Sequence, residues 1–172
     1  LQSKCLSKII QSIIMKKKLK KIYILDNENT LNNNILTARG AAINGFKNLA
    51  DKHFFLLDKK NKIKFNLIKK LKYEEDFMIF GFTHIIWENF IKQLIKLSYK
   101  IPKNNGFLFH GGGWKKLEKI SIDKRKFNQL LKNFSGINKI YNYYGMIEQT
   151  GSIFIECEQG YFHPSIFSDI NI

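Results

Sequence analysis

Toward the carboxyl end of the sequence, an aromatic ring, a glycine and a carboxylate lie close together. Tyr144, Gly145 and Glu148 fall within five residues. A tyrosine ring can stack on a purine, a glycine permits a sharp turn, and carboxylate oxygens are ligands that Mg²⁺ accepts. The spacing fits a loop that holds a nucleotide and its magnesium ion, but on spacing alone we favour a tight turn with a surface glutamate.

A second candidate loop contains three consecutive glycines. Gly111, Gly112 and Gly113 are followed by Trp114 and Lys115. Because glycine has no side chain, such a loop lets backbone N–H groups approach a flat or phosphorylated ligand, while the tryptophan adds an aromatic face and the lysine a cation. Glycine loops of this kind also occur as plain turns, and this one lacks the spacing and the Ser or Thr of a P-loop.

The remaining reactive side chains give weaker indications. Cys157 and His163 could be two ligands of a metal, but a zinc site needs four, so we favour a buried thiol beside a histidine whose hydrogen bonds are satisfied. His84 and His110 end or follow predicted strands. Either could line a substrate pocket, and we favour capping or core packing for each.

Short apolar runs alternate with helical patterns along most of the chain. Apolar residues at helical spacing in 9–19 precede a strand that ends in Asp26. Small residues in 38–46 allow close helix packing or a sharp backbone approach. Further strands are expected at 53–57, 77–80, 107–110, 139–143, 152–157 and 160–163, and helices at 86–97 and from Ser121 or Asp123 to Gly136.

This alternation predicts a single α/β unit over residues 1–172, with a largely parallel sheet and flanking helices. Ligands of open parallel sheets bind beyond the carboxyl ends of the strands. Both glycine loops follow predicted strands, so both lie where such sheets bind ligands.

Composition limits the possible partners. The net charge of +15 comes almost entirely from lysine, since Arg39 and Arg125 are the only arginines, and we expect no nucleic-acid partner. Seven lysines between Lys59 and Lys72 are interpreted as a solvated surface. Two cysteines form no disulfide framework, and no apolar run is long enough for a transmembrane segment, so we expect a cytoplasmic protein.

Two segments together resemble the acyl-protein synthetase family of LuxE type, within the adenylate-forming (ANL) superfamily, and are similar to phenylacetate–coenzyme A ligases. They are the run from Phe109 to Lys116, FHGGGWKK, and the run from Tyr144 to Glu158, YGMIEQTGSIFIECE, continued by GYFH at 160–163. The likeness includes the ARGA segment at 38–41 and FGFT at 80–83.

The resemblance implies a fold, a reaction and a set of site residues. The chain would be part of the large N-terminal domain of an enzyme that uses ATP and Mg²⁺ to convert a carboxylic acid, a long-chain fatty acid above all, into acyl-AMP and then passes the acyl group to a thiol of a protein or carrier. An acyl-accepting or reductase protein is the implied partner. Glu148 would bind magnesium and be catalytic; the implied nucleotide-binding residues are Gly111, Gly112, Gly113, Trp114, Tyr144, Gly145, Met146 and Thr150.

The family's phosphate loop and mobile C-terminal domain have no counterpart in these residues. We therefore expect a fragment that is inactive alone. A non-catalytic remnant, or a nucleotide- or acyl-binding module of the same fold, is the alternative; a basic nucleic-acid binder is a weaker one.

Overall fold

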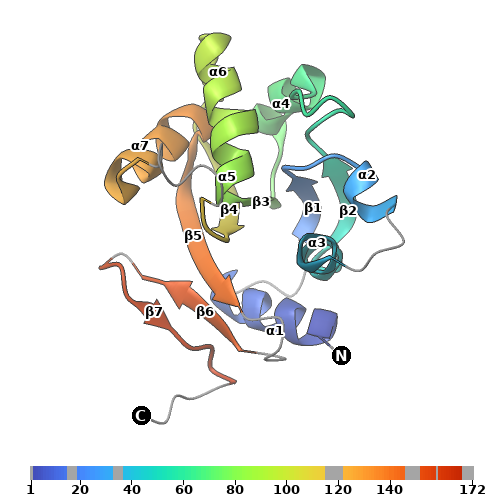
Figure 1. Cartoon of the computed structure of the whole chain (residues 1–172), viewed down its shortest axis with the longest axis vertical. Coiled ribbons are helices and arrows are strands. Elements are labelled where there is room, and N and C mark those ends of the chain that lie inside the picture. The colour runs from blue at the N-terminus through green and yellow to red at the C-terminus, as the bar shows by residue number, and fades with distance from the viewer. Residues whose placement is uncertain are drawn as a thin grey trace.

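The computed structural model describes residues 2–14, 19–32, 37–114, 122–145, 152–157 and 159–167. Seven strands within these ranges form one sheet in the order β2-β1-β3-β4-β5-β6-β7 (Figure 1). The strands are β1 Leu19–Ile24, β2 Ala50–Phe55, β3 Phe77–Phe82, β4 Asn104–Gly111, β5 Ile137–Gly145, β6 Ile153–Glu156 and β7 Phe162–His163. The helices are α1 Gln2–Ile14, α2 Asn29–Asn32, α3 Ala38–Lys47, α4 Phe65–Lys70, η1 Leu71–Tyr73, α5 Thr83–Ile85, η2 Ile86–Ile91, α6 Lys92–Lys96 and α7 Lys124–Ser135.

Strands β1 to β5 run parallel, and β6 and β7 continue the sheet as an antiparallel hairpin. The predicted α/β fold with a largely parallel sheet is therefore confirmed. The parallel part has the order 2-1-3-4-5 of a doubly wound sheet, so the carboxyl ends of its strands share one edge.

Alternate residues of each strand point into two separate hydrophobic cores. On one face, Tyr23 and Ile79 pack with residues of α4 to α7 such as Phe90 and Leu131. On the other face, Phe80 and its strand neighbours pack with residues of α1 and α3. Because both faces of the central strands are covered, these strands are apolar along their whole length, as the short apolar runs of the sequence indicate.

The predicted helix of residues 86–97 exists, but it begins earlier and is irregular. Residues 83–96 form one continuous helical segment whose middle part, η2, is a π-helix. A π-helix changes the rotation of the side chains that follow it, which a regular spacing pattern does not reveal. The helical pattern predicted for residues 9–19 is wrong at its end, because Leu19 is the first residue of β1. Helix α4 was not predicted from the sequence.

Both expected ends of α7 are confirmed. The Asp123 side chain accepts hydrogen bonds from the backbone N–H groups of Arg125 and Lys126, and Gly136 ends the helix with φ of 69°. In α3, the close-packing interpretation holds, because a Cβ on Gly45 would lie 2.4 Å from the Leu6 side chain of α1. Ser121, the other expected start of α7, lies outside the described residues.

Candidate nucleotide-binding site

The pairing of β4 with β5 brings the two predicted loops together. Gly111, the last residue of β4, lies opposite Tyr143 in the parallel register. The next residues are Gly112, which follows the end of β4, and Tyr144, which still belongs to β5 and pairs with Phe154 of β6. The triple-glycine loop therefore leaves the sheet beside the end of β5. The predicted turn at Gly145 is wrong, because Tyr144 and Gly145 continue β5 and pair with β6.

Two of the three glycines have structural reasons to lack a side chain. A Cβ on Gly111 would lie 2.6 Å from Cε1 and 2.7 Å from the backbone oxygen of Tyr143. Gly112 has φ of +73°, a conformation that other residues rarely adopt. The loop thus leaves β4 in close contact with β5 and turns at once, and its backbone stays uncovered by side chains where Gly112 and Gly113 are exposed.

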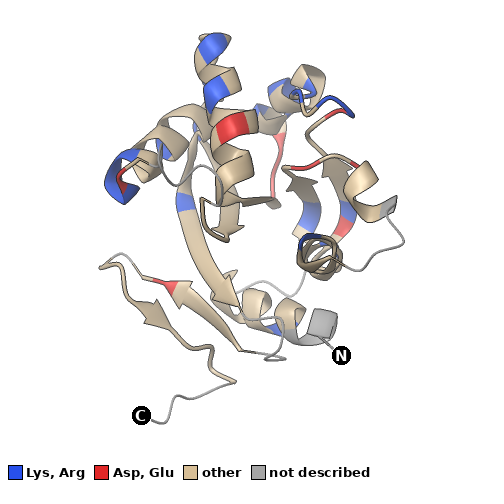
Figure 2. Cartoon of the chain, viewed as in Figure 1, with Lys and Arg blue, Asp and Glu red and all other residues tan. Residues whose placement is uncertain are grey.

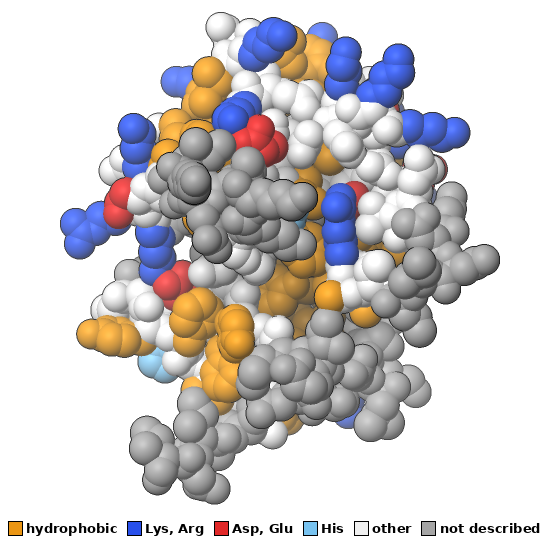
Figure 3. Space-filling view, in the orientation of Figure 1, with side chains coloured by type: hydrophobic (Ala, Val, Ile, Leu, Met, Phe, Trp, Pro, Cys, Tyr) orange, Lys and Arg blue, Asp and Glu red, His pale blue; other side chains and the backbone are white. Residues whose placement is uncertain are grey.

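Tyr144 presents half of its surface to solvent. It is 51% exposed, and its ring lies 6.3 Å from the ring centroids of both Phe154 in β6 and Phe162 in β7. Hydrophobic side chains gather over the β6–β7 hairpin, as Figure 3 shows. The ring therefore has an aromatic support and a free surface, which is what stacking on a planar ligand requires.

Trp114, at the end of the triple-glycine loop, packs more deeply. Its ring makes edge contacts with Trp87 of η2 at 6.0 Å and with Phe127 of α7 at 5.4 Å between centroids. This anchors the loop to the helices on that face of the sheet. A contact between Trp114 and a ligand stays a prediction.

Three predicted site residues lie outside the described residues. They are Met146, Thr150 and Glu148, the last being the predicted magnesium ligand. Gly145 ends β5 and is exposed, and a Cβ there would make only ordinary contacts, at 3.7 Å or more.

A polar groove of about 760 Å³ adjoins the two loops on the α7 face of the sheet. His110 and Asn142, which precede Gly111 and Tyr143, are cross-strand neighbours and line this groove. The amide nitrogen of Asn142 donates to Oε2 of Glu156 at 3.0 Å, and the other carboxylate oxygen of Glu156 is paired with Lys124. The spacing of the sequence did not predict this groove, because its walls come from β4, β5, β6 and α7.

His110 takes part in a buried hydrogen-bond network at the base of the triple-glycine loop. The Thr83 hydroxyl lies 3.1 Å from Nδ1 of His110 and donates to the backbone oxygen of Gly111 at 3.2 Å. Burial is the main cause that lowers the pKa of His110, Glu156 opposes the shift, and Lys124 adds to it. The resulting pKa is about 4, so the ring is neutral at pH 7. The expectation that His110 packs in the core is correct, and it lines the groove as well.

Near the carboxyl end of β1, a buried carboxylate holds the following helices in place. Asp26 is 1% exposed and receives two hydrogen bonds of 2.6 Å from the guanidinium of Arg39. The Thr30 hydroxyl and the Asn27 backbone N–H donate to the same carboxylate at 2.7 Å each. All four donors are used to hold α2 and α3 against β1, so this cluster is structural.

The predicted pairing of a thiol with a histidine is present in the hairpin. Burial raises the pKa of Cys157, but hydrogen bonds from His163 and from the backbone N–H groups of Tyr161 and Gln159 outweigh it, and the net pKa is below the usual value. Cys157 is partly exposed rather than buried as expected. No group of three or more metal-ligating side chains occurs within the part of the chain that the structure describes.

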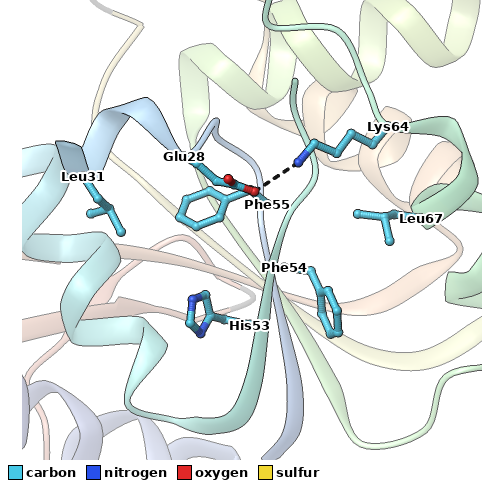
Figure 4. A pocket seen from close by; sticks show the side chains of 7 residues that line it. All are labelled: Glu28, Leu31, His53, Phe54, Phe55, Lys64 and Leu67. Carbon is cyan, nitrogen blue, oxygen red and sulfur yellow. Dashed lines mark hydrogen bonds and ion pairs between the residues drawn. The ribbon is translucent and has the colours of Figure 1, made fainter. Parts of the chain in front are cut away.

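A smaller pocket of about 340 Å³ lies at the other side of the sheet, at β2 (Figure 4). Phe54, Phe55 and two leucines form apolar walls, and Glu28 and Lys64 reach toward each other across its rim with a 3.3 Å contact. Strands β1 and β3 separate it from β4. We therefore do not connect it with the glycine loops.

The lysines are spread over several elements rather than aligned. Figure 2 shows Lys and Arg together on α4, α6 and α7 and on strands of the sheet. Six of the seven lysines between Lys59 and Lys72 are exposed, and the seventh, Lys64, contacts Glu28, so the solvated-surface interpretation holds. None of the helices in the described ranges is long and apolar enough to cross a membrane.

Comparison with known families identifies the family to which the chain belongs. The sequence model described as "Acyl-protein synthetase, LuxE" matches residues 1–172. The chain belongs to the LuxE acyl-protein synthetase family. We found no match to a curated protein or to a solved structure. Enzymes of the LuxE family use ATP, so the triple-glycine loop and the adjacent end of β5 are the candidates for the nucleotide site of this LuxE chain.

Proposed function

We propose that this chain carries the adenine-binding part of an acyl-protein synthetase that activates a long-chain fatty acid. The observation that carries the proposal is the register of β4 and β5, which sets Gly111 beside Tyr143. An exposed glycine backbone and the half-exposed ring of Tyr144 then lie on adjacent strands, at the edge where doubly wound sheets bind ligands.

The residues fit a nucleotide in three respects. The backbone at Gly112 and Gly113 is uncovered and can lie against a flat base. The Tyr144 ring has one supported side and one free surface. Below them, His110 and Asn142 provide polar groups within a groove large enough for a small ligand.

The proposed reaction has two steps. A carboxylate oxygen of the fatty acid attacks the α-phosphorus of ATP and pyrophosphate leaves; a thiolate then attacks the acyl carbonyl and AMP leaves. Both steps depend on holding the phosphates and the acid in line, and the first needs no nucleophile from the protein. Glu148 is the residue that we propose to hold Mg²⁺, which neutralises phosphate charge.

Nucleotide binding by the 172-residue chain tests the proposal, with Tyr144→Ala as the variant. Stacking on an aromatic side chain contributes about 1–3 kcal/mol per base, so the variant should bind ATP at least about fivefold more weakly by isothermal titration calorimetry. Tyr161→Ala is the matched control, because Tyr161 is 71% exposed on the same hairpin and away from β4. Equal affinity of the two variants would contradict the proposed site.

A binding module without catalysis is the second candidate. It predicts the same ATP binding and the same effect of Tyr144→Ala, without acid-dependent release of pyrophosphate. A nucleic-acid binder predicts instead an affinity for polynucleotides that falls steeply with salt and does not depend on Tyr144.

A further inference from the structure

The outer edge of β5 is covered by another strand over only part of its length. Strand β6 pairs with Tyr143, Tyr144 and Gly145 and then leaves the line of β5, as Figure 1 shows. Residues 138–141 have β4 on one side, and no strand pairs with their other side in the part of the chain that the structure describes. Alternate backbone N–H and C=O groups of residues 138–141 therefore point outward, as at any sheet edge.

This free edge forms one wall of the polar groove of about 760 Å³, whose other walls are α7 and the turn between β6 and β7. Proteins commonly block such an edge with a charged side chain, a proline or a covering segment. The one charged residue among 138–141 is Lys139, and its ammonium lies over the Phe107 ring of β4, 4.9 Å from the centroid. The edge is therefore open to an added strand.

At one end, the groove already holds a carboxylate of the chain itself. Oε2 of Glu156 accepts a hydrogen bond of 3.0 Å from the side-chain amide of Asn142. Oε1 of Glu156 is paired with Lys124. A lysine of α7 and an asparagine of β5 thus hold a carboxylate between them.

The same two residue types recur farther along the groove without a carboxylate. Lys132 follows Lys124 by eight residues and so lies on the same face of α7, while Asn138 precedes Asn142 by four residues and so lies on the same face of β5. Both are exposed and line the groove. Three lysines of the groove face a single acidic residue, Glu156, so the groove has a positive charge to offer an anionic partner.

We propose that an acidic, extended segment of a partner protein binds along residues 138–141 and adds a strand to the sheet. Its backbone pairs with the free edge of β5, and one of its carboxylates is held by Lys132 and Asn138. Backbone pairing supplies affinity and the side-chain contact supplies selectivity in this mode of recognition. A nucleic acid would match the charge of the groove but not the strand edge. The proposal does not depend on the proposed function.

A labelled five-residue peptide that alternates glutamate and valine is the probe, with binding to the 172-residue chain followed by fluorescence anisotropy. Alternation places all its glutamates on one face of an added strand. The chain should bind this peptide at least about tenfold more tightly than a lysine–valine peptide of the same length. Methylation of the backbone nitrogens of the glutamate peptide keeps its charge and removes its backbone donors, and should abolish binding. Equal binding of the methylated peptide would overturn strand addition.

Two charge reversals on α7 test the place of binding. Lys132→Glu puts a carboxylate against the carboxylates of the peptide and should weaken binding by about tenfold. Lys126→Glu is the matched control, because Lys126 is exposed on α7 outside the groove and the net charge changes equally; it should change the affinity by less than about twofold. Asn138→Asp, on the strand, is a second variant that should match Lys132→Glu. Equal losses in Lys132→Glu and Lys126→Glu would show general attraction to a basic chain and overturn the proposal.

Amide hydrogen exchange tests the added strand itself. With the glutamate peptide bound, exchange should slow at residues 138–141 and stay unchanged at β2, the strand at the opposite edge of the sheet. Unchanged exchange at 138–141 would contradict the proposal. Polyuridylate at equal concentration in 0.15 M salt should not displace the peptide; displacement would identify the groove as a nucleic-acid site and overturn the proposal too.

Discussion

Adding one methyl group at Gly111 tests whether β4 and β5 are packed as closely as the site requires. In Gly111→Ala, the new Cβ would lie 2.6 Å from the Tyr143 ring and 2.7 Å from the Tyr143 backbone oxygen, both well inside ordinary contact distance. The ring could rotate away, but the backbone oxygen belongs to the sheet and cannot. The strands must therefore separate locally.

The expected cost follows from that geometry. Overpacking in a well-packed region costs about 1–3 kcal/mol, and the backbone clash places this variant at about 2–3 kcal/mol. Urea denaturation followed by circular dichroism should show this loss in the free energy of unfolding, with ATP affinity lost as well because the glycine loop moves.

Gly145→Ala is the matched control on the paired strand. Its Cβ would meet Ile153 at 3.7 Å and Ser152 at 3.8 Å, which is ordinary contact, so stability should change by less than about 0.5 kcal/mol. If Gly111→Ala is as stable as Gly145→Ala, β4 and β5 do not pack as closely as described. The described geometry of the site is then wrong too.

Three further predictions concern charged and titratable groups. Asp26→Asn breaks a buried bidentate ion pair and should lower the free energy of unfolding by about 3 kcal/mol in urea titrations, whereas Glu88→Gln, in an exposed pair, should cost less than about 0.5 kcal/mol. Because the folded-state pKa of His110, about 4, lies below the unfolded value of 6.5, the unfolded chain binds the extra proton between these pH values. The free energy of unfolding should therefore show no loss from His110 above pH 6.5 and should fall by up to about 3 kcal/mol as the pH drops to 4. This part of the pH dependence should vanish in His110→Gln. His163→Ala should raise the pKa of Cys157 and slow its alkylation by iodoacetamide at pH 7; an unchanged rate would show that the histidine does not favour the thiolate.

The sequence predicted the elements whose patterns are local. Strands such as β3 and β4 are short apolar runs bounded by polar or glycine residues, and α7 carries its own signals in Asp123 and Gly136. Helix α4 was missed because its segment is dominated by exposed lysines, and its buried side chains are few. The π-helix was missed because its irregularity comes from packing and not from a residue type.

The candidate site was predicted in its loops and not in its surroundings. Glycine runs and the tyrosine–glycine pair are visible in the sequence, and strand order places them together. The link from Thr83 to His110 joins residues 27 positions apart across β3 and β4, and only the sheet register makes them neighbours. The one available signal was a hydroxyl directly after an apolar strand, which is too common to indicate a role.

Acid-dependent exchange of pyrophosphate into ATP tests the central claim most directly. Protein that contains this chain should incorporate labelled pyrophosphate into ATP only when a long-chain fatty acid is present, and Tyr144→Ala should reduce that exchange by about fivefold or more. Binding of ATP without exchange across a panel of carboxylic acids would contradict the assignment of acyl activation to this fold.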